Sequence, residues 1–185
     1  MVESHDAGNS IIDLDKLRAN RERRIDDLTK DPTKALMEKV VEVKLIKNYH
    51  KEAKARGFTI VSDEPEMLNG TNLAPQPTEY MLASLAFCQM SIYANVASSM
   101  RIPIDSLEIS VKGKRDNRGL LGIADVRPGY KEITIETNIR ANGQEDRILR
   151  MAELVEKHCP VYDNLANPVP IKNNVNLNGN RLGTI

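Results

Sequence analysis

Two cysteines are the residues of this chain with the clearest capacity for chemistry. Cys88 lies within an uncharged stretch that runs between Glu79 and Arg101, and Cys159 stands between His158 and a proline. Two thiols that meet in space can reduce a peroxide: one thiolate attacks the O–O bond and becomes a sulfenic acid, and the other thiol condenses with it to a disulfide. Spacing alone does not show that they meet. Either cysteine can instead be a packing residue, because free cysteine is among the most buried residue types.

The histidines do not suggest a metal centre. His5, His50 and His158 are scattered, without Cys-x-x-Cys or His-x-x-x-His spacing, so we expect neither a metal nor a cofactor. His158 can act as a general base beside Cys159 or simply suit the negative end of a helix dipole, and we favour the second interpretation. The "DEP" at 63–65 is typical of a turn without a catalytic role.

Composition narrows the class of protein. The chain has 185 residues, a length that fits one domain with a single core. It has 26 Lys plus Arg and 26 Asp plus Glu, so it lacks the excess of basic residues that would indicate binding to a nucleic acid or a membrane surface. The first ten residues, "MVESHDAGNS", lack the regions of a signal peptide, so we expect a cytoplasmic protein. A structural disulfide would be unusual in that reducing compartment.

The uncharged stretch predicts a long buried helix. Pro77 suits the first helical position, Glu79 lies in the first turn, Arg101 stands at the far end and Pro103 follows it. A helix of this length could span a bilayer, but scattered Ser, Asn and Gln residues interrupt its apolar run. We therefore predict a helix buried in the middle of a protein.

Strand pairs that alternate with helices predict an α+β domain built on antiparallel sheets. The expected elements are a charged helical region within 11–32, a hairpin over 41–61, strands at 106–115 and 130–140, an amphipathic helix over 142–159 that its following proline closes, and an edge strand within 167–175. We divide the chain into a charged helical N-terminal extension (1–35), the main domain (36–176) and a polar C-terminal tail (177–185). So few strands cannot cover an apolar central helix, which predicts a twofold homodimer.

Three segments together carry a family resemblance, over roughly 40–175. They are "NGTNLAPQPTEYMLASLAFCQMSIYANVASSMRIPIDSLEISVKGKRD", "HCPVYDNL" and "NPVPI". A proline-led helix with Leu-Ala-x-Leu-Ala-x-Cys, followed at a distance by Cys-Pro-Val and a leucine, resembles the OsmC/Ohr family of osmotically inducible and organic hydroperoxide resistance proteins. The segment "RGLLGIADVRPGY" and the charged extension resemble a less studied branch, in which the second cysteine is not always kept.

The resemblance implies a fold and a set of site residues. Members are intertwined α+β homodimers, with antiparallel sheets around a long buried central helix. In the peroxidase members the helix cysteine attacks and the Cys-Pro cysteine resolves, roles that fall on Cys88 and Cys159. A Glu and an Arg hold the attacking thiolate there, for which Glu79 and Arg56 are our candidates, with Arg24 in reserve. Glu79 stands two positions after a proline, whereas the family's peroxidases have Pro-Glu directly, a change of about 100° around the helix.

The expected activity is therefore reduction of organic hydroperoxides by a redox-active cysteine, with an external thiol or dithiol as reductant and an antioxidant, stress-response role. Apolar residues near the helix cysteine would favour lipophilic peroxides; they are Leu82, Leu85, Phe87 and Met90. The alternative is a non-enzymatic dimer of the same fold that binds a small apolar ligand, its cysteines only structural. Neither hypothesis calls for a nucleic acid or a membrane as partner.

Overall fold

The computed structural model describes residues 10–185. The first nine residues, which include most of the segment without signal-peptide features, lie outside the described residues. In chain order the helices and strands are α1 (Leu14–Lys30), β1 (Glu42–Lys47), β2 (His50–Ala55), β3 (Phe58–Ser62), α2 (Pro77–Met100), β4 (Ile104–Arg115), α3 (Asn117–Leu121), β5 (Tyr130–Ala141), α4 (Glu145–His158), α5 (Pro160–Ala166), β6 (Asn174–Leu177) and β7 (Asn180–Thr184). Two short 3-10 helices, η2 (Pro32–Ala35) and η3 (Glu66–Leu68), complete the described chain.

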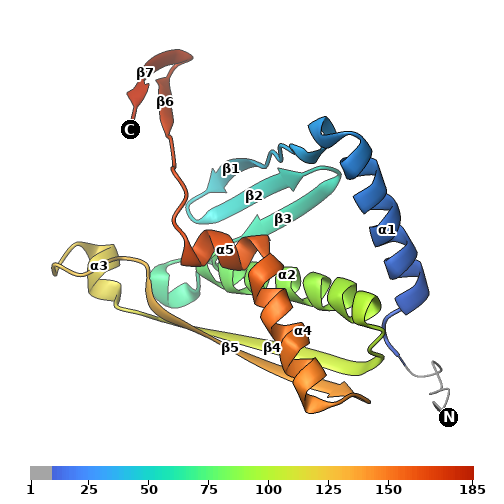
Figure 1. The fold of residues 1–185 in the computed structure, drawn as a ribbon. Helices are drawn as coiled ribbons and strands as arrows, with labels where there is room; N and C mark the ends of the chain where they lie inside the picture. Colours follow the sequence, from blue (N-terminus) through green and yellow to red (C-terminus); the bar gives the residue numbers. More distant parts are fainter. Residues whose placement is uncertain (1–9) are drawn as a thin grey trace, which may run out of the picture.

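The strands form three antiparallel sheets, with orders β1-β2-β3, β4-β5 and β6-β7. In Figure 1, α2 runs between the three-stranded sheet and the long β4–β5 ribbon, and α4 crosses it. The helix contacts α1, α4, α5 and β4. The predicted α+β class with antiparallel sheets is therefore confirmed.

Helix α2 begins at Pro77, as its sequence predicts, and ends where Arg101 adopts a left-handed conformation with φ 57°. Its fully buried residues within one chain are Leu85, Gln89, Tyr93, Ala97 and Ser98. Helix α2 is long and apolar enough to cross a membrane, but the core helices of soluble proteins meet the same two criteria. Within a single chain, most other residues of α2 are only half-buried, and Phe87 is 68% exposed.

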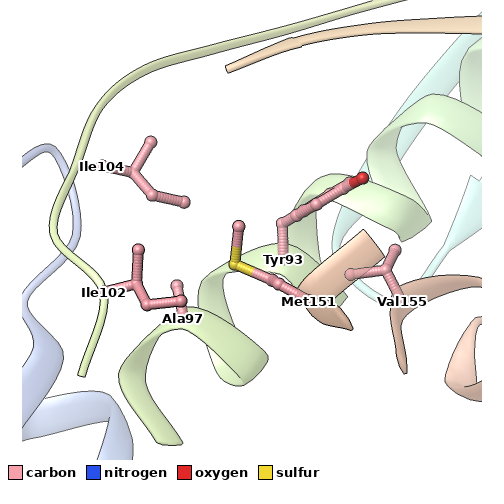
Figure 2. Packing of buried hydrophobic residues seen from close by; sticks show 6 residues of the cluster. All are labelled: Tyr93, Ala97, Ile102, Ile104, Met151 and Val155. Carbon is pink, nitrogen blue, oxygen red and sulfur yellow. The ribbon is translucent and has the colours of Figure 1, made fainter. Parts of the chain in front are cut away.

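The core lies at the C-terminal half of α2. Tyr93 and Ala97 of α2 pack with Ile102 and Ile104, which lead into β4, and with Met151 and Val155 of α4 (Figure 2). The α4 residues are four positions apart and so lie on one face of that helix. Burying an aliphatic side chain of this size contributes about 1.5–3 kcal/mol, so this cluster holds α4 and β4 against α2.

The three-stranded sheet differs from the predicted hairpin by one strand. Two of its strands, β1 and β3, carry the apolar residues on which the prediction rested. The strand between them, β2, has the sequence HKEAKA, which has no apolar alternation to mark it. It is a strand because it pairs with both neighbours, an effect of tertiary context that its own residues do not encode.

The C-terminal region also holds more structure than predicted. Pro160 does not only end α4; it opens α5 at the first helical position, where its missing N–H costs nothing. Residues of the expected polar tail form β7, which pairs with β6. Asn178 and Gly179 connect the two strands with φ 52° and 84°, the left-handed pair that an Asn-Gly hairpin turn favours.

Candidate active site

The structure brings the two cysteines together. Cys88 lies on α2, and Cys159 is the residue at which α4 ends and α5 begins. Both thiols are free, and Cys88 lies near enough to Cys159 to raise the pKa of its thiol. Cys159 is 1% exposed, whereas Cys88 is half-buried. The packing of α2 against α4 and α5 thus unites two residues that are distant in sequence.

The environment of Cys159 favours its protonated form. Burial raises the pKa of this thiol, and the neighbouring Cys88 raises it further. The Tyr162 N–H at the start of α5 donates to Cys159 Sγ at 3.4 Å and opposes this effect. Because burial has the largest effect, Cys159 stays a thiol at neutral pH.

Glu79 stabilises the start of α2. Its carboxylate accepts a hydrogen bond from the Gln76 N–H at 2.8 Å, and its side chain is exposed. Nine residues separate Glu79 from Cys88, which at about 100° per residue places them about 180° apart around the helix. Met81 and Leu85, by contrast, lie on the Cys88 side. One chain therefore does not bring Glu79 to the thiol pair.

Arg56 occupies the exposed turn between β2 and β3, in a left-handed conformation with φ 56°. Its guanidinium carbon lies 5.2 Å from the centre of the Phe58 ring, a cation–π geometry. The reserve candidate, Arg24, is an exposed residue of α1. Within the described part of one chain, the contact seen for Arg56 is with Phe58, not with either cysteine.

The apolar residues predicted near Cys88 are divided between two hollows. Leu82, Phe87 and Met90 line an open groove of about 800 Å³ beside Glu79. Leu85 lines a cavity of about 480 Å³ on the Cys88 side of α2, between α2, β5 and α5. Its apolar walls are formed by Met81, Leu85, Ile133, Ile135 and Leu165. We call this hollow the β5 cavity; neither cysteine is among its lining residues.

A buried carboxylate shapes the loop that leads into α2. Asp63, in the segment predicted to be a turn, is 1% exposed and accepts hydrogen bonds from the Thr71 N–H at 2.9 Å, the Thr71 hydroxyl at 2.5 Å and the Leu73 N–H at 3.3 Å. These bonds hold the pKa of Asp63 well below its usual range, the Thr71 hydroxyl having the largest effect. Asp63 thus fixes the loop before α2. The sequence feature that could have identified this role is that an acidic residue directly follows an apolar strand.

The histidines do not form a site in the part of the chain that the structure describes. His158 is exposed in the last turn of α4, where a cation suits the helix dipole. His50 lies on β2 with its Nε2 3.7 Å from Glu52 Oε1, and His5 lies outside the described residues. Residues 10–185 contain no cluster of three His, Cys, Asp or Glu side chains that could hold a metal ion.

Comparison with known proteins agrees with this architecture. The family model described as OsmC-like protein matches residues 70–174, more than half of the chain, and spans both cysteines. A curated relative, the hydroperoxide reductase of Mycoplasma genitalium, is 27% identical over 101 residues, which cover 55% of this chain and 69% of the relative.

Solved structures share the fold at low sequence identity. An OsmC-like protein from Mycoplasma pneumoniae superposes with a TM-score of 0.63 and 23% identity, over 71% of this chain and 89% of that one. An organic hydroperoxide resistance protein OsmC from Legionella pneumophila superposes with a TM-score of 0.55 and 16% identity, over 71% and 91%. These structures support the fold that the family match implies. The chain belongs to the OsmC-like protein family.

Proposed function

We propose that this protein reduces organic hydroperoxides with its own thiols, Cys88 attacking and Cys159 resolving. The observation that carries the proposal is the nearness of the two free thiols, which the packing of α2 against α4 and α5 creates from distant segments. Membership of the OsmC-like family supports it, as does the relative from Mycoplasma genitalium that is named a hydroperoxide reductase.

The chemistry needs only the two thiols, a proton and an external reductant. The Cys88 thiolate attacks the outer peroxide oxygen, the O–O bond breaks, and the alkoxide takes a proton to leave as an alcohol while Cys88 becomes a sulfenic acid. The Cys159 sulfur then attacks the Cys88 sulfur, which releases water and forms a disulfide. An external thiol or dithiol reduces that disulfide by exchange and is itself oxidised.

The two environments support this division of roles. Cys159 is buried with a raised pKa, which suits a thiol that acts second. Cys88 is half-buried on the side of α2 that borders the β5 cavity. Glu79 and Arg56 remain our candidates for holding the thiolate, and since one chain does not bring them to Cys88, a second subunit would have to supply them.

A homodimer is the second part of the proposal. The 800 Å³ groove is lined mostly by apolar side chains, and one of them, Phe87, is 68% exposed. Helix α2 is apolar along its length yet has only five fully buried residues in one chain. A copy of the same surface would cover this face by twofold symmetry, which removes the unfavourable contact of apolar side chains with water.

The activity is tested by following the loss of cumene hydroperoxide with dithiothreitol as the external dithiol. We expect turnover by the unaltered protein and none above background for Cys88→Ser. Cys159→Ser should complete the first step and then depend on dithiothreitol to attack the sulfenic acid directly. Equal turnover by Cys88→Ser and the unaltered protein would contradict the proposal.

The alternative function is binding of a small apolar ligand without chemistry. The observation in its favour is the near-complete burial of Cys159, which is typical of a packing residue. Under this alternative, Cys88→Ser would change stability only, through a hydroxyl placed in a partly apolar site, and no variant would alter peroxide loss. The same assay therefore separates the two functions.

A further inference from the structure

Helix α5 is short and only partly buried. It has seven residues, none of them fully buried, whereas isolated helices shorter than about 12–15 residues are marginal in water. The segment that follows, 167–173, is exposed, and in Figure 1 it leads away from the body of the molecule to the β6–β7 hairpin. The stability of α5 therefore depends on its packing against α2 and α4 and on the way its first turn is capped.

The sulfur of Cys159 caps this first turn. Pro160 has no N–H, and the Asp163 N–H donates to the Cys159 carbonyl at 3.0 Å. The Tyr162 N–H donates to Cys159 Sγ at 3.4 Å, and a hydrogen bond from the Val161 N–H also lowers the pKa of this thiol. The two N–H groups that the backbone leaves free are thus directed at a single sulfur atom.

The proposed disulfide needs that sulfur in a different position. A disulfide holds its sulfur atoms about 2.05 Å apart, closer than two unbonded thiols approach, so at least one of the two free thiols must move. Cys88 lies inside a regular helix of 24 residues, whereas Cys159 lies between two helices with φ −84° and ψ 108°. Cys159 is therefore the freer of the two to turn. Turning towards Cys88 draws its sulfur, a weak acceptor, away from the N–H groups of α5.

We propose that oxidation of the thiol pair uncaps α5 and loosens this helix. The oxidant is the hydroperoxide of the proposed function, on which the inference rests: it takes two electrons and two protons from the thiols and becomes an alcohol and water, while the disulfide forms.

Loosening of α5 would serve the reduction step. Cys159 is 1% exposed while α5 is capped, so an external dithiol does not reach its sulfur in this conformation. Helix α5 also forms one wall of the β5 cavity, through Tyr162, Leu165 and Ala166. Its movement exposes the disulfide and opens this wall. The dithiol then returns two electrons and two protons, and the restored Cys159 thiol caps the helix again.

Hydrogen–deuterium exchange of the full-length protein, followed by peptide mass spectrometry, tests the inference. The disulfide is formed with diamide, which oxidises thiols without any peroxide, and its presence is checked on unreduced peptides. We expect the amides of 161–167 to exchange about fivefold or more faster in the oxidised than in the reduced protein, the scale of a lost helix cap. The amides of 148–155, in the middle of α4, should not change and are the internal control.

Two substitutions of the same residue separate capping from oxidation. Cys159→Ser keeps an oxygen that is a favoured cap, so α5 should exchange slowly both before and after diamide treatment. Cys159→Ala has no cap, so α5 should exchange as fast without oxidant as it does in the oxidised unaltered protein. Circular dichroism checks that both variants fold, and the comparison within the unaltered chain does not depend on them.

Equal exchange of α5 in the reduced and the diamide-oxidised protein would overturn the inference, as would equal exchange in the folded Ser and Ala variants. Either result leaves the proposed function standing if cumene hydroperoxide is still reduced. If the diamide-formed disulfide loosens α5 but no peroxide is reduced, the proposed function fails and the structural change stands. Failure of diamide to join the two cysteines would overturn both.

Discussion

At the scale of single residues, burial gives the two neighbouring thiols different reactivity. Cys159 is almost inaccessible and its pKa is raised, mainly by burial, so its thiolate is scarce below the ordinary cysteine pKa of about 8.5. Cys88 is half-buried. We expect iodoacetamide at pH 7.5 to label Cys88 well before Cys159 in the reduced protein, and the rates to converge in urea. Peptide mass spectrometry at timed intervals measures both. Labelling of Cys159 first would remove the basis for its assignment as the resolving thiol.

A second residue-scale prediction concerns Asp63. Its folded pKa is depressed, so the stability it contributes is present above the unfolded value of about 3.9 and is lost as pH falls towards the folded pKa. Asp63→Asn should therefore be less stable than the unaltered protein at pH 7. The difference should shrink as pH falls below about 4, because the unaltered protein then loses the contribution that the variant never had. Urea unfolding at several pH values checks this, and a pH-independent difference would contradict it.

At the scale of elements, the position of α2 depends on how closely the ribbon approaches it. A Cβ added at Gly113 of β4 would lie 2.4 Å from the Tyr130 ring, whose hydroxyl bonds to the Thr78 carbonyl at the start of α2. Gly113→Ala should displace that ring and cost about 1–3 kcal/mol of unfolding free energy. Gly183→Ala is the matched control in a strand, because nothing lies within 4 Å of its added Cβ. Urea unfolding compares the two, and equal stabilities would show that Tyr130 does not fix this contact.

The sequence predicts elements well where their own residues carry the signal. Helix α2 has a proline at its start and an apolar run, and α4 has a clear apolar stripe, so both could be located. Strand β2 could not, because its charged sequence becomes a strand only between two partners. The Asn178-Gly179 turn was present in the sequence as a hairpin signal, but its polar surroundings led to the prediction of a tail.

Part of the site was predictable, because the two cysteines carry a signal in the sequence itself. The thiol pair was predicted from a family pattern, and in the structure α2, which carries Cys88, packs against α4 and α5, between which Cys159 lies. The surroundings of Cys88 were not predictable, because they depend on which face of α2 meets which strand. That orientation places Leu85 at the β5 cavity and Glu79 at the open groove.

At the scale of the whole molecule, the exposed apolar face of α2 predicts association. Phe87→Glu should convert the proposed homodimer to a monomer, because Phe87 is exposed in one chain and would be buried in the dimer. Burial of a side chain this large contributes about 1.5–3 kcal/mol in each subunit, so its loss should raise the Kd of the dimer more than tenfold. Phe87→Leu, which keeps the surface apolar, should retain the dimer. Sedimentation velocity measures the change, with circular dichroism to confirm folding. A monomeric unaltered protein, or a dimeric Phe87→Glu variant, would contradict the proposed assembly.

If Cys88 and Cys159 form one redox pair, a single oxidation consumes both thiols, which can be counted and mapped directly. Reduced protein is mixed with one equivalent of cumene hydroperoxide, its remaining thiols are titrated, and its peptides are mapped without reductant. We expect loss of both thiols in one step and a disulfide that joins Cys88 to Cys159 within a chain. Retention of both free thiols after exposure to the peroxide would contradict it.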